Sequence, residues 1–203
     1  HREGAKTFRA ITRYAKEMGI KYITFYAFST ENWQRPADEV KSIMDLFEKY
    51  LDEVRDFVDE NIRVRFIGDR SKLNPRLQDK MHRVEEDSKD FDSMTLILAI
   101  NYGGRDEITH AVKEIAKSVE SGQLSPEDIT QELIQSRLYT GDIPDVDLII
   151  RPSGEQRLSN FLIWQSAYAE YYFTNILWPD FSKKDLENAV LAYSERNRRF
   201  GGV

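Results

Sequence analysis

The sequence predicts a single α/β domain with a mostly parallel central sheet flanked by helices. Short segments with the composition of buried strands alternate along the chain with segments of helical period, an order that is typical of α/β folds. Residues 94–100 (MTLILAI) are apolar without interruption, as expected for a strand that is covered on both faces. The 203 residues contain no internal repeat, low-complexity stretch or clear linker, so we expect one domain over residues 1–203.

The expected helices are recognised by apolar side chains that recur every three or four residues. The longest has a main stripe from Val40 to Val58 and a second stripe of Leu46, Tyr50 and Phe57. A helix that is apolar on two faces is either deeply buried or borders an apolar cavity. The other expected helices cover residues 5–18, 75–87, 108–119, 161–167 and 183–199, and one more begins at Pro126 with Ser125 as its N-cap.

The expected strands are short and rich in β-branched and aromatic residues. They cover residues 21–28, 62–67, 94–100, 146–150 and 170–173. In open parallel sheets, ligands bind beyond the carboxyl ends of the strands. The functional site should therefore be sought in the segments that follow strands, which are residues 29–36, 68–71, 101–105 and 151–159.

Composition excludes several kinds of site and partner. The chain has no cysteine, which excludes disulfides, zinc sites built on thiolates and a cysteine nucleophile. The net charge of −6 and the pI of about 5.3 disfavour a general nucleic-acid binder, so we expect no nucleic-acid partner. No apolar run reaches the roughly 18 residues of a membrane span. The common dinucleotide-binding, P-loop, hydrolase and zinc-protease motifs are also absent.

Residues 151–159 (RPSGEQRLS) combine the groups of a diphosphate-binding loop. Guanidinium groups bind phosphate oxygens in bidentate fashion, and hydroxyl groups add further donors. These groups belong to Arg151, Ser153, Arg157 and Ser159. Gly154 allows the backbone to approach a ligand closely, and the start of the helix expected at residue 161 would add amide donors. The alternative is a surface loop whose arginines pair with Asp145 or Asp147.

Residues 29–36 (STENWQRP) bring together a carboxylate, a carboxamide, an indole and a guanidinium directly after a strand. Loops with such a variety of side chains often bind ligands. The alternative is a plain entry to the next helix, with Pro36 in the first helical position and Trp33 as a hydrophobic staple. For residues 101–105 (NYGGR) we expect a structural turn with a glycine in the left-handed conformation.

Glu170 stands in an otherwise apolar and aromatic stretch, AYAEYYF. A carboxylate in such surroundings must be paired, protonated or bound to a metal. Mg²⁺ commonly takes one or two protein carboxylates together with substrate phosphates and water. The alternative is an ion pair with a nearby arginine.

Taken together, these segments resemble the cis-prenyltransferases of the bacterial undecaprenyl diphosphate synthase type. Motifs of that family occur in the family's order from the first residue to nearly the last. The matching stretches are HREGA (1–5), YAFSTENW (26–33) with Arg35 and Pro36, IGD (67–69), NYGGR (101–105), IRPSGEQRLSNF (150–161), WQ (164–165), YAE (168–170), LWPDF (177–181) and RRFGG (198–202).

The resemblance implies the cis-prenyltransferase fold with an apolar tunnel. It implies repeated cis-condensation of isopentenyl diphosphate with an allylic diphosphate, usually farnesyl diphosphate. The product would be a long-chain polyprenyl diphosphate, which we expect to be the undecaprenyl carrier lipid for cell-wall glycan and peptidoglycan synthesis. The family requires Mg²⁺ and forms homodimers. We expect a cytoplasmic enzyme that contacts the membrane surface transiently to release its product.

Residue roles follow from the same resemblance. Asn32 is the expected catalytic residue and assists removal of the C2 proton; an amide is a poor base, so it would orient a water or a phosphate oxygen. Glu170 is the expected Mg²⁺ ligand, and Met94 is the candidate limit on chain length. The expected substrate-binding residues are His1, Ser29, Thr30, Glu31, Trp33, Arg35, Arg151, Arg157, Leu158 and Ser159.

Within this set, the resemblance divides the two substrates between different residues. Arg151, Arg157 and Ser159 would hold the diphosphate of isopentenyl diphosphate, while His1 would help to bind the allylic diphosphate. The segment 199–201 matches a motif that reaches into the partner subunit's site.

The resemblance also leaves a gap and two alternatives. The family's Mg²⁺-binding aspartate and its Gly-Asn-Gly-Arg-Trp-type phosphate loop align before His1, so we expect an upstream segment that carries both, together with the first strand. One alternative is a non-catalytic partner subunit of a heteromeric cis-prenyltransferase, against which the intact loop 151–159 and Glu170 argue. The other is a phosphate-ester-binding hydrolase that uses the same arginine loop.

Overall fold

Every strand pairing between residues 2 and 196, which this computed structural model describes, is parallel. Three strands form one sheet in the order β1-β3-β2, and two form a second sheet. The strands are β1 (Tyr22–Ser29), β2 (Ile62–Ile67), β3 (Met94–Tyr102), β4 (Leu148–Arg151) and β5 (Glu170–Phe173). The α/β class predicted from the sequence is therefore confirmed, although the described residues form two sheets where we expected one central sheet.

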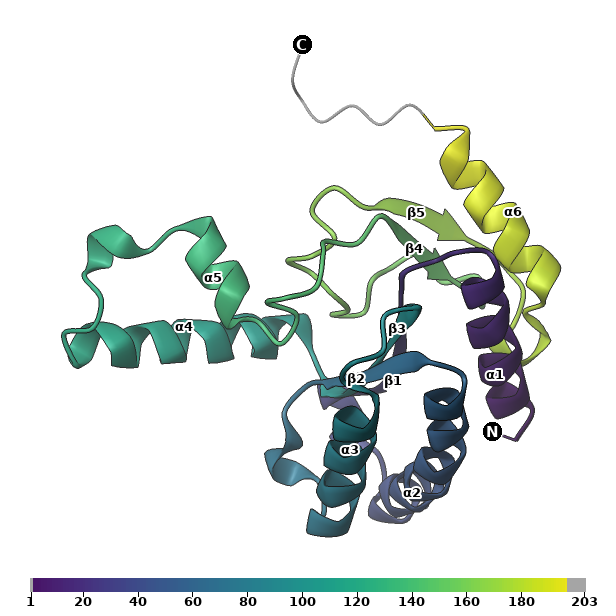
Figure 1. Ribbon diagram of the computed structural model, residues 1–203, viewed down its shortest axis with the longest axis horizontal. Helices are drawn as coiled ribbons and strands as arrows, with labels where there is room; N and C mark the ends of the chain where they lie inside the picture. Colours follow the sequence, from purple (N-terminus) through teal and green to yellow (C-terminus); the bar gives the residue numbers. More distant parts are fainter. Residues whose placement is uncertain (1, 197–203) are drawn as a thin grey trace.

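The helices alternate with the strands as predicted. They are α1 (Arg2–Glu17), α2 (Ala37–Asp59), α3 (Pro75–Ser88), α4 (Gly104–Glu120), α5 (Gln131–Arg137) and α6 (Lys183–Ser194). Helices α2 and α3 lie side by side against the three-stranded sheet, whereas α1 and α6 flank the two-stranded one (Figure 1). Helices α4 and α5 extend away from both sheets as an arm. None of the helices within residues 2–196 has a stretch long and apolar enough to cross a membrane.

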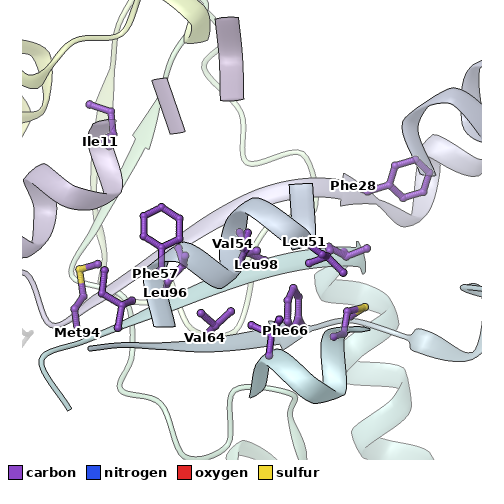
Figure 2. Packing of buried hydrophobic residues seen from close by; sticks show 14 of the residues in the cluster. Ile11, Phe28, Leu51, Val54, Phe57, Val64, Phe66, Met94, Leu96 and Leu98 are labelled. Carbon is purple, nitrogen blue, oxygen red and sulfur yellow. The ribbon is translucent and has the colours of Figure 1, made fainter. Parts of the chain in front are cut away.

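The core lies on both faces of β3, as the uninterrupted apolar run predicts. Leu96 and Leu98 belong to the larger cluster, which includes Val54 and Phe57 of α2 (Figure 2). Ile97 and its neighbours on the other face belong to a second, smaller cluster. Successive side chains of a strand point to opposite faces, so a strand that is apolar at every position can serve two cores.

Two predicted helices are wrong. Residues 161–167 form a series of turns, because Asn160 and Leu162 have positive φ angles of 65° and 44°, which an α-helix cannot contain. Ser125 begins only a short 3₁₀ turn, η3 (Pro126–Asp128), because Ile129 and Thr130 are extended. Helix α5 then begins afresh with Thr130 as its N-cap.

Gly68, directly after β2, lies against the backbone at the end of β3. Its φ is +120°, and a Cβ there would lie 2.1 Å from the carbonyl oxygen of Ile100 and 2.8 Å from that of Asn101. We expect Gly68→Ala to lower the free energy of unfolding by roughly 3 kcal/mol or more, because the neighbours that must yield are backbone atoms.

The matched control is Gly122→Ala, where φ is +73° and no atom lies within 4 Å of the added Cβ. This substitution should cost only about 1 kcal/mol. Urea denaturation followed by circular dichroism measures both values. Equal losses for the two variants would contradict the role assigned to Gly68.

Candidate functional site

A cavity of about 1100 Å³ lies between β1 and β4. Its wall is mostly apolar, and Leu46, Tyr50 and Phe57 contribute to it. These three residues are the second stripe of α2, for which we expected either deep burial or a bordering cavity. The helix borders a cavity, and Phe57 is in addition fully buried in the core. The strand ends contribute polar side chains to the cavity: Asn32 and Arg35 after β1, Arg151 at the end of β4, and Ser153 and Arg157 after it. Other polar residues, among them Arg9 and Glu53, also line the cavity.

The segment after β1 folds into a 3₁₀ turn, η1 (Thr30–Gln34), that is tied to itself. The backbone N–H of Ser29 donates to Oδ1 of Asn32 at 2.9 Å. The side chain of Asn32 can donate hydrogen bonds only through its NH₂ group. Arg35 forms an ion pair with Glu39, at 2.5 Å, in the first turn of α2. The turn is thus an entry to α2, as the alternative interpretation held, although Pro36 is the N-cap of this helix and not its first residue. The turn also places polar groups at the cavity.

Trp33 links this turn to the end of β3. Its ring packs edge-on against Phe28, with centroids 5.2 Å apart, and its Nε1–H donates to Oδ1 of Asn101 at 2.7 Å. The Nδ2 group of Asn101 donates in turn to the carbonyl oxygen of Asp69 at 2.6 Å. Asn101 therefore joins the ends of three strands.

The left-handed residue of the 101–105 turn is Asn101, with φ 50°, and not a glycine as we expected. Gly103 has an extended backbone, with φ −154°. The expected structural role of this turn stands, since Asn101 is buried and its carboxamide bonds on both sides. Asparagine visits the left-handed region more readily than most residues, which explains why it can replace glycine here.

Glu31 of η1 is held from across the site. Its Oε1 accepts a hydrogen bond from Nδ2 of Asn160 at 2.7 Å, and Thr30 Oγ1 donates to its Oε2 at 3.2 Å. Burial opposes ionisation, but the hydrogen bonds from Asn160, Ser29 and Thr30 outweigh it, so the pKa of Glu31 lies below its ordinary value. Glu31 is therefore a carboxylate at neutral pH.

Tyr26 is a site residue that sequence reasoning missed. Its ring stacks on Phe161 at 4.6 Å, and its hydroxyl donates to the carbonyl oxygen of Tyr102 at 2.9 Å. Burial and the charge of Glu31 raise the pKa of Tyr26, against an opposing effect of Arg151, so the phenol stays protonated. Tyr26 lies at the cavity beside the predicted site residues, and a phenol within an expected buried strand, three residues before the segment 29–36, was the available signal.

The loop 151–159 is fixed by main-chain hydrogen bonds to the segment after β5. Thr174 N–H donates to the carbonyl oxygen of Arg151 at 3.0 Å, and Gly154 N–H donates to that of Thr174 at 2.8 Å. Arg157 is exposed and forms an ion pair with Glu155. Leu158 lines the cavity, and Ser159 is exposed with φ 51°. Because no helix follows this loop, the expected amide donors of a helix start are not there.

Glu170 lies apart from that loop. It pairs in register with Leu148, three residues before Arg151, so the Cα atoms of Glu170 and Arg151 are about 10 Å apart along the β4–β5 ladder. Its Oε2 accepts a hydrogen bond from Nη1 of Arg196 at 2.6 Å. The ion pair considered as an alternative is thus present.

The metal-binding capacity of the described residues is small. Between residues 2 and 196, no group of three or more acidic or histidine side chains is placed to hold a metal ion. Glu170 by itself could supply one carboxylate to a Mg²⁺ site whose remaining ligands are phosphate oxygens and water. Its metal role stays a prediction.

The other predicted residues fall into two groups. Met94, at the start of β3, is buried in the larger core cluster, whereas the cavity wall takes Ile97, Leu98 and Ile100 from this strand. A role of Met94 in chain length stays a prediction. His1 and the segment 199–201 lie outside the described residues.

Comparison with known proteins identifies the family. A family model described as undecaprenyl diphosphate synthase matches residues 1–201. The chain belongs to this family. An isoprenyl transferase of Thermotoga maritima is 49% identical over 204 residues, which cover 100% of this chain and 87% of that protein. The ditrans,polycis-undecaprenyl-diphosphate synthase of Escherichia coli K12, specific for (2E,6E)-farnesyl diphosphate, is 46% identical, with coverage of 100% and 81%.

A solved structure extends the similarity to the fold. Lavandulyl diphosphate synthase from Lavandula x intermedia, in complex with dimethylallyl diphosphate, superposes with a TM-score of 0.95. It is 39% identical, and the match covers 100% of this chain and 88% of that one. The chain is therefore a prenyltransferase with the fold of the cis-prenyltransferase family, and neither alternative function is favoured.

Proposed function

We propose that this prenyltransferase condenses isopentenyl diphosphate with farnesyl diphosphate in repeated, Mg²⁺-dependent cis steps. The product is a long-chain polyprenyl diphosphate that serves as the undecaprenyl carrier lipid of cell-wall glycan synthesis. The observation that carries the proposal is the lining of the cavity, which has guanidinium groups at the strand ends and apolar side chains of α2 along its wall. Guanidinium groups suit diphosphates, and the apolar wall that α2 forms suits a growing hydrocarbon chain.

The residues at the strand ends have distinct tasks in this proposal. Arg151, Arg157 and Ser159 bind the diphosphate of isopentenyl diphosphate. The allylic C–O bond breaks as negative charge collects on the departing diphosphate, and fixed guanidinium groups stabilise that charge. The oxygen of Asn32 already accepts from Ser29, so its amide N–H₂ orients a water or phosphate oxygen toward the C2 proton. The apolar wall excludes water from the allylic carbon.

Mg²⁺ would neutralise charge on the diphosphates, with Glu170 as one of its ligands. For that, Glu170 must exchange its bond to Arg196 for the metal.

We also propose that an additional strand from upstream of His1 fits between β1 and β4 and brings the family's phosphate loop and metal-binding aspartate. Residues 20–28 and 144–153 line the cavity without a break. Alternating side chains cannot do this from one face of a sheet, so the edges of both strands face the cavity. In the described residues, β1 pairs only with β3, and β4 only with β5. Fast amide exchange along β1 in the full-length enzyme would contradict this proposal.

The proposed assembly is a cytoplasmic homodimer that touches the membrane surface transiently for product release. Sedimentation analysis tests the first part, and flotation with anionic lipid vesicles in the presence of product tests the second. A monomer with full activity would overturn the dimer.

The first measurement is an assay with radiolabelled isopentenyl diphosphate, farnesyl diphosphate and Mg²⁺, with products resolved by chain length. We expect polyprenyl products that disappear when the metal is chelated. Release of inorganic phosphate without carbon–carbon bond formation would favour the hydrolase. A folded sample that becomes active only when a second, different subunit is added would favour the silent partner.

Arg151→Ala should chiefly weaken binding of isopentenyl diphosphate. Loss of charge-assisted hydrogen bonds to phosphate should raise the KM for this substrate by about 10- to 100-fold. The KM for farnesyl diphosphate should change far less. Arg137→Ala, in the exposed part of α5, is the matched control and should leave both values unchanged. An equal loss of affinity for both substrates would mean that Arg151 belongs to the other pocket.

Glu170→Gln should remove most Mg²⁺-dependent turnover, because the amide loses the charge that the metal requires. Arg196→Ala separates this role from the ion pair, since it leaves the carboxylate but removes its partner. We expect Arg196→Ala to retain turnover and to need no more Mg²⁺ than the native enzyme. If both variants lose the same activity at every Mg²⁺ concentration, the ion pair and not metal binding is the role of Glu170.

A further inference from the structure

Asn160 occupies a strained position immediately after the predicted diphosphate-binding loop. Its φ is 65°, and Ser159 and Leu162 have φ angles of 51° and 44°. Left-handed conformations of residues other than glycine cost free energy and persist only where surrounding contacts determine them. The contacts that hold Asn160 reach two other strand ends.

The first contacts of Asn160 are to the start of α4. Its carbonyl oxygen accepts from Gly104 N–H at 2.7 Å, and its Oδ1 accepts from Arg105 N–H at 2.9 Å. Backbone N–H groups only donate, which assigns the carboxamide oxygen to this side. The Nδ2 group must therefore face the other way.

On that other side lies η1. Nδ2 of Asn160 donates to Oε1 of Glu31 at 2.7 Å, across 129 positions of sequence. Gly103 stands between the two segments, since a Cβ there would lie 2.5 Å from Oγ1 of Thr30 and 2.7 Å from Nδ2 of Asn160. The segments after β1, β3 and β4 thus meet around one carboxamide.

We propose that Asn160 is a positioning residue, which holds η1 through Glu31 and thereby sets where Asn32 and Arg35 stand at the cavity. This inference rests on the proposed function. Glu31 is otherwise exposed, and its other side-chain hydrogen bonds are to Ser29 and Thr30, which precede it in the chain. The bond to Asn160 is therefore what connects η1 to the diphosphate-binding side. The competing interpretation is that Asn160 merely caps α4.

Asn160→Asp separates the two interpretations. Aspartate keeps the acceptor for Arg105 N–H and tolerates the left-handed backbone, but it removes the donor and places a second carboxylate against Glu31. We expect kcat/KM to fall about ten-fold or more, with little change in the thermal unfolding midpoint. Hydrogen–deuterium exchange of the amides in residues 29–36 should accelerate. If Asn160 only caps α4, both readouts stay at the native level.

Rescue gives the sharper test. In Asn160→Asp combined with Glu31→Gln, donor and acceptor exchange places, because the new amide can donate to the new carboxylate. We expect Asn160→Asp to lower kcat/KM far less when Glu31→Gln is already present. The acceleration of amide exchange in residues 29–36 should also be far smaller. The same fold-loss in both backgrounds would show that the two residues are not coupled and would overturn the proposal.

The control is Asn61→Asp, which introduces the same charge at an exposed asparagine with φ 58° in the turn between α2 and β2. It should change neither readout. Amide exchange requires no turnover, so it tests the position of η1 even if the native chain makes no polyprenyl product. Failure of the proposed function and failure of this inference are therefore distinguishable.

Discussion

The parallel pairing of β1, β3 and β2 is the constraint on which the candidate site depends. It brings the carboxyl ends of the three strands to one edge, so the segments that follow them must share a small space. Buried N–H and C=O groups at such a meeting point need partners. Asn101 supplies them: its carbonyl oxygen accepts from Asp69 N–H at 3.1 Å, and its carboxamide bonds to Asp69 and Trp33. A residue with a donor, an acceptor and tolerance of positive φ is required here, which leaves few choices besides asparagine.

The distribution of charge indicates where at the cavity an anionic ligand would bind. The chain carries a net charge of −6, yet arginines stand at the strand ends beside the cavity. Several arginines pair with carboxylates, as in the pair of Arg70 with Glu85, at 2.7 Å, and that of Arg35 with Glu39, at 2.5 Å. Arg151 lies near the phenol of Tyr26, which is protonated and carries no charge. Low-dielectric walls concentrate the field of a guanidinium group toward an anionic ligand.

The sequence predicted those parts of the fold that depend on local pattern. Strand β2 and strand β5 have the predicted bounds, and the second stripe of α2 was correctly read as facing the interior or a cavity, because burial imposes a period on the residues themselves. The helix expected over residues 161–167 failed because apolar composition does not reveal the positive φ angles of Asn160 and Leu162. Asn160 is held by contacts with α4 and η1, which are remote in sequence.

In the candidate site, too, local features were predictable and remote contacts were not. The loops of the site could be located, because strand ends are visible in the sequence. The hydrogen-bond partners of Glu31 and Glu170 could not be predicted. A carboxylate in an apolar stretch is compatible with metal, proton or ion pair, and only the tertiary structure brings Arg196 to Glu170.

The strained backbone around Ser159 has a consequence for how a diphosphate could bind. Left-handed residues at 159, 160 and 162 direct successive peptide groups to different neighbours: the carbonyl oxygen of Asn160 to Gly104, and its carboxamide to Arg105 and Glu31. Each of these bonds helps to offset a conformation that would cost about 1–2 kcal/mol per residue in isolation. A loop determined in this way need not reorganise when an anion arrives, so less of the binding free energy is lost to ordering it. The contacts of Asn160 thus hold the strained backbone next to Ser159 in one arrangement without any ligand.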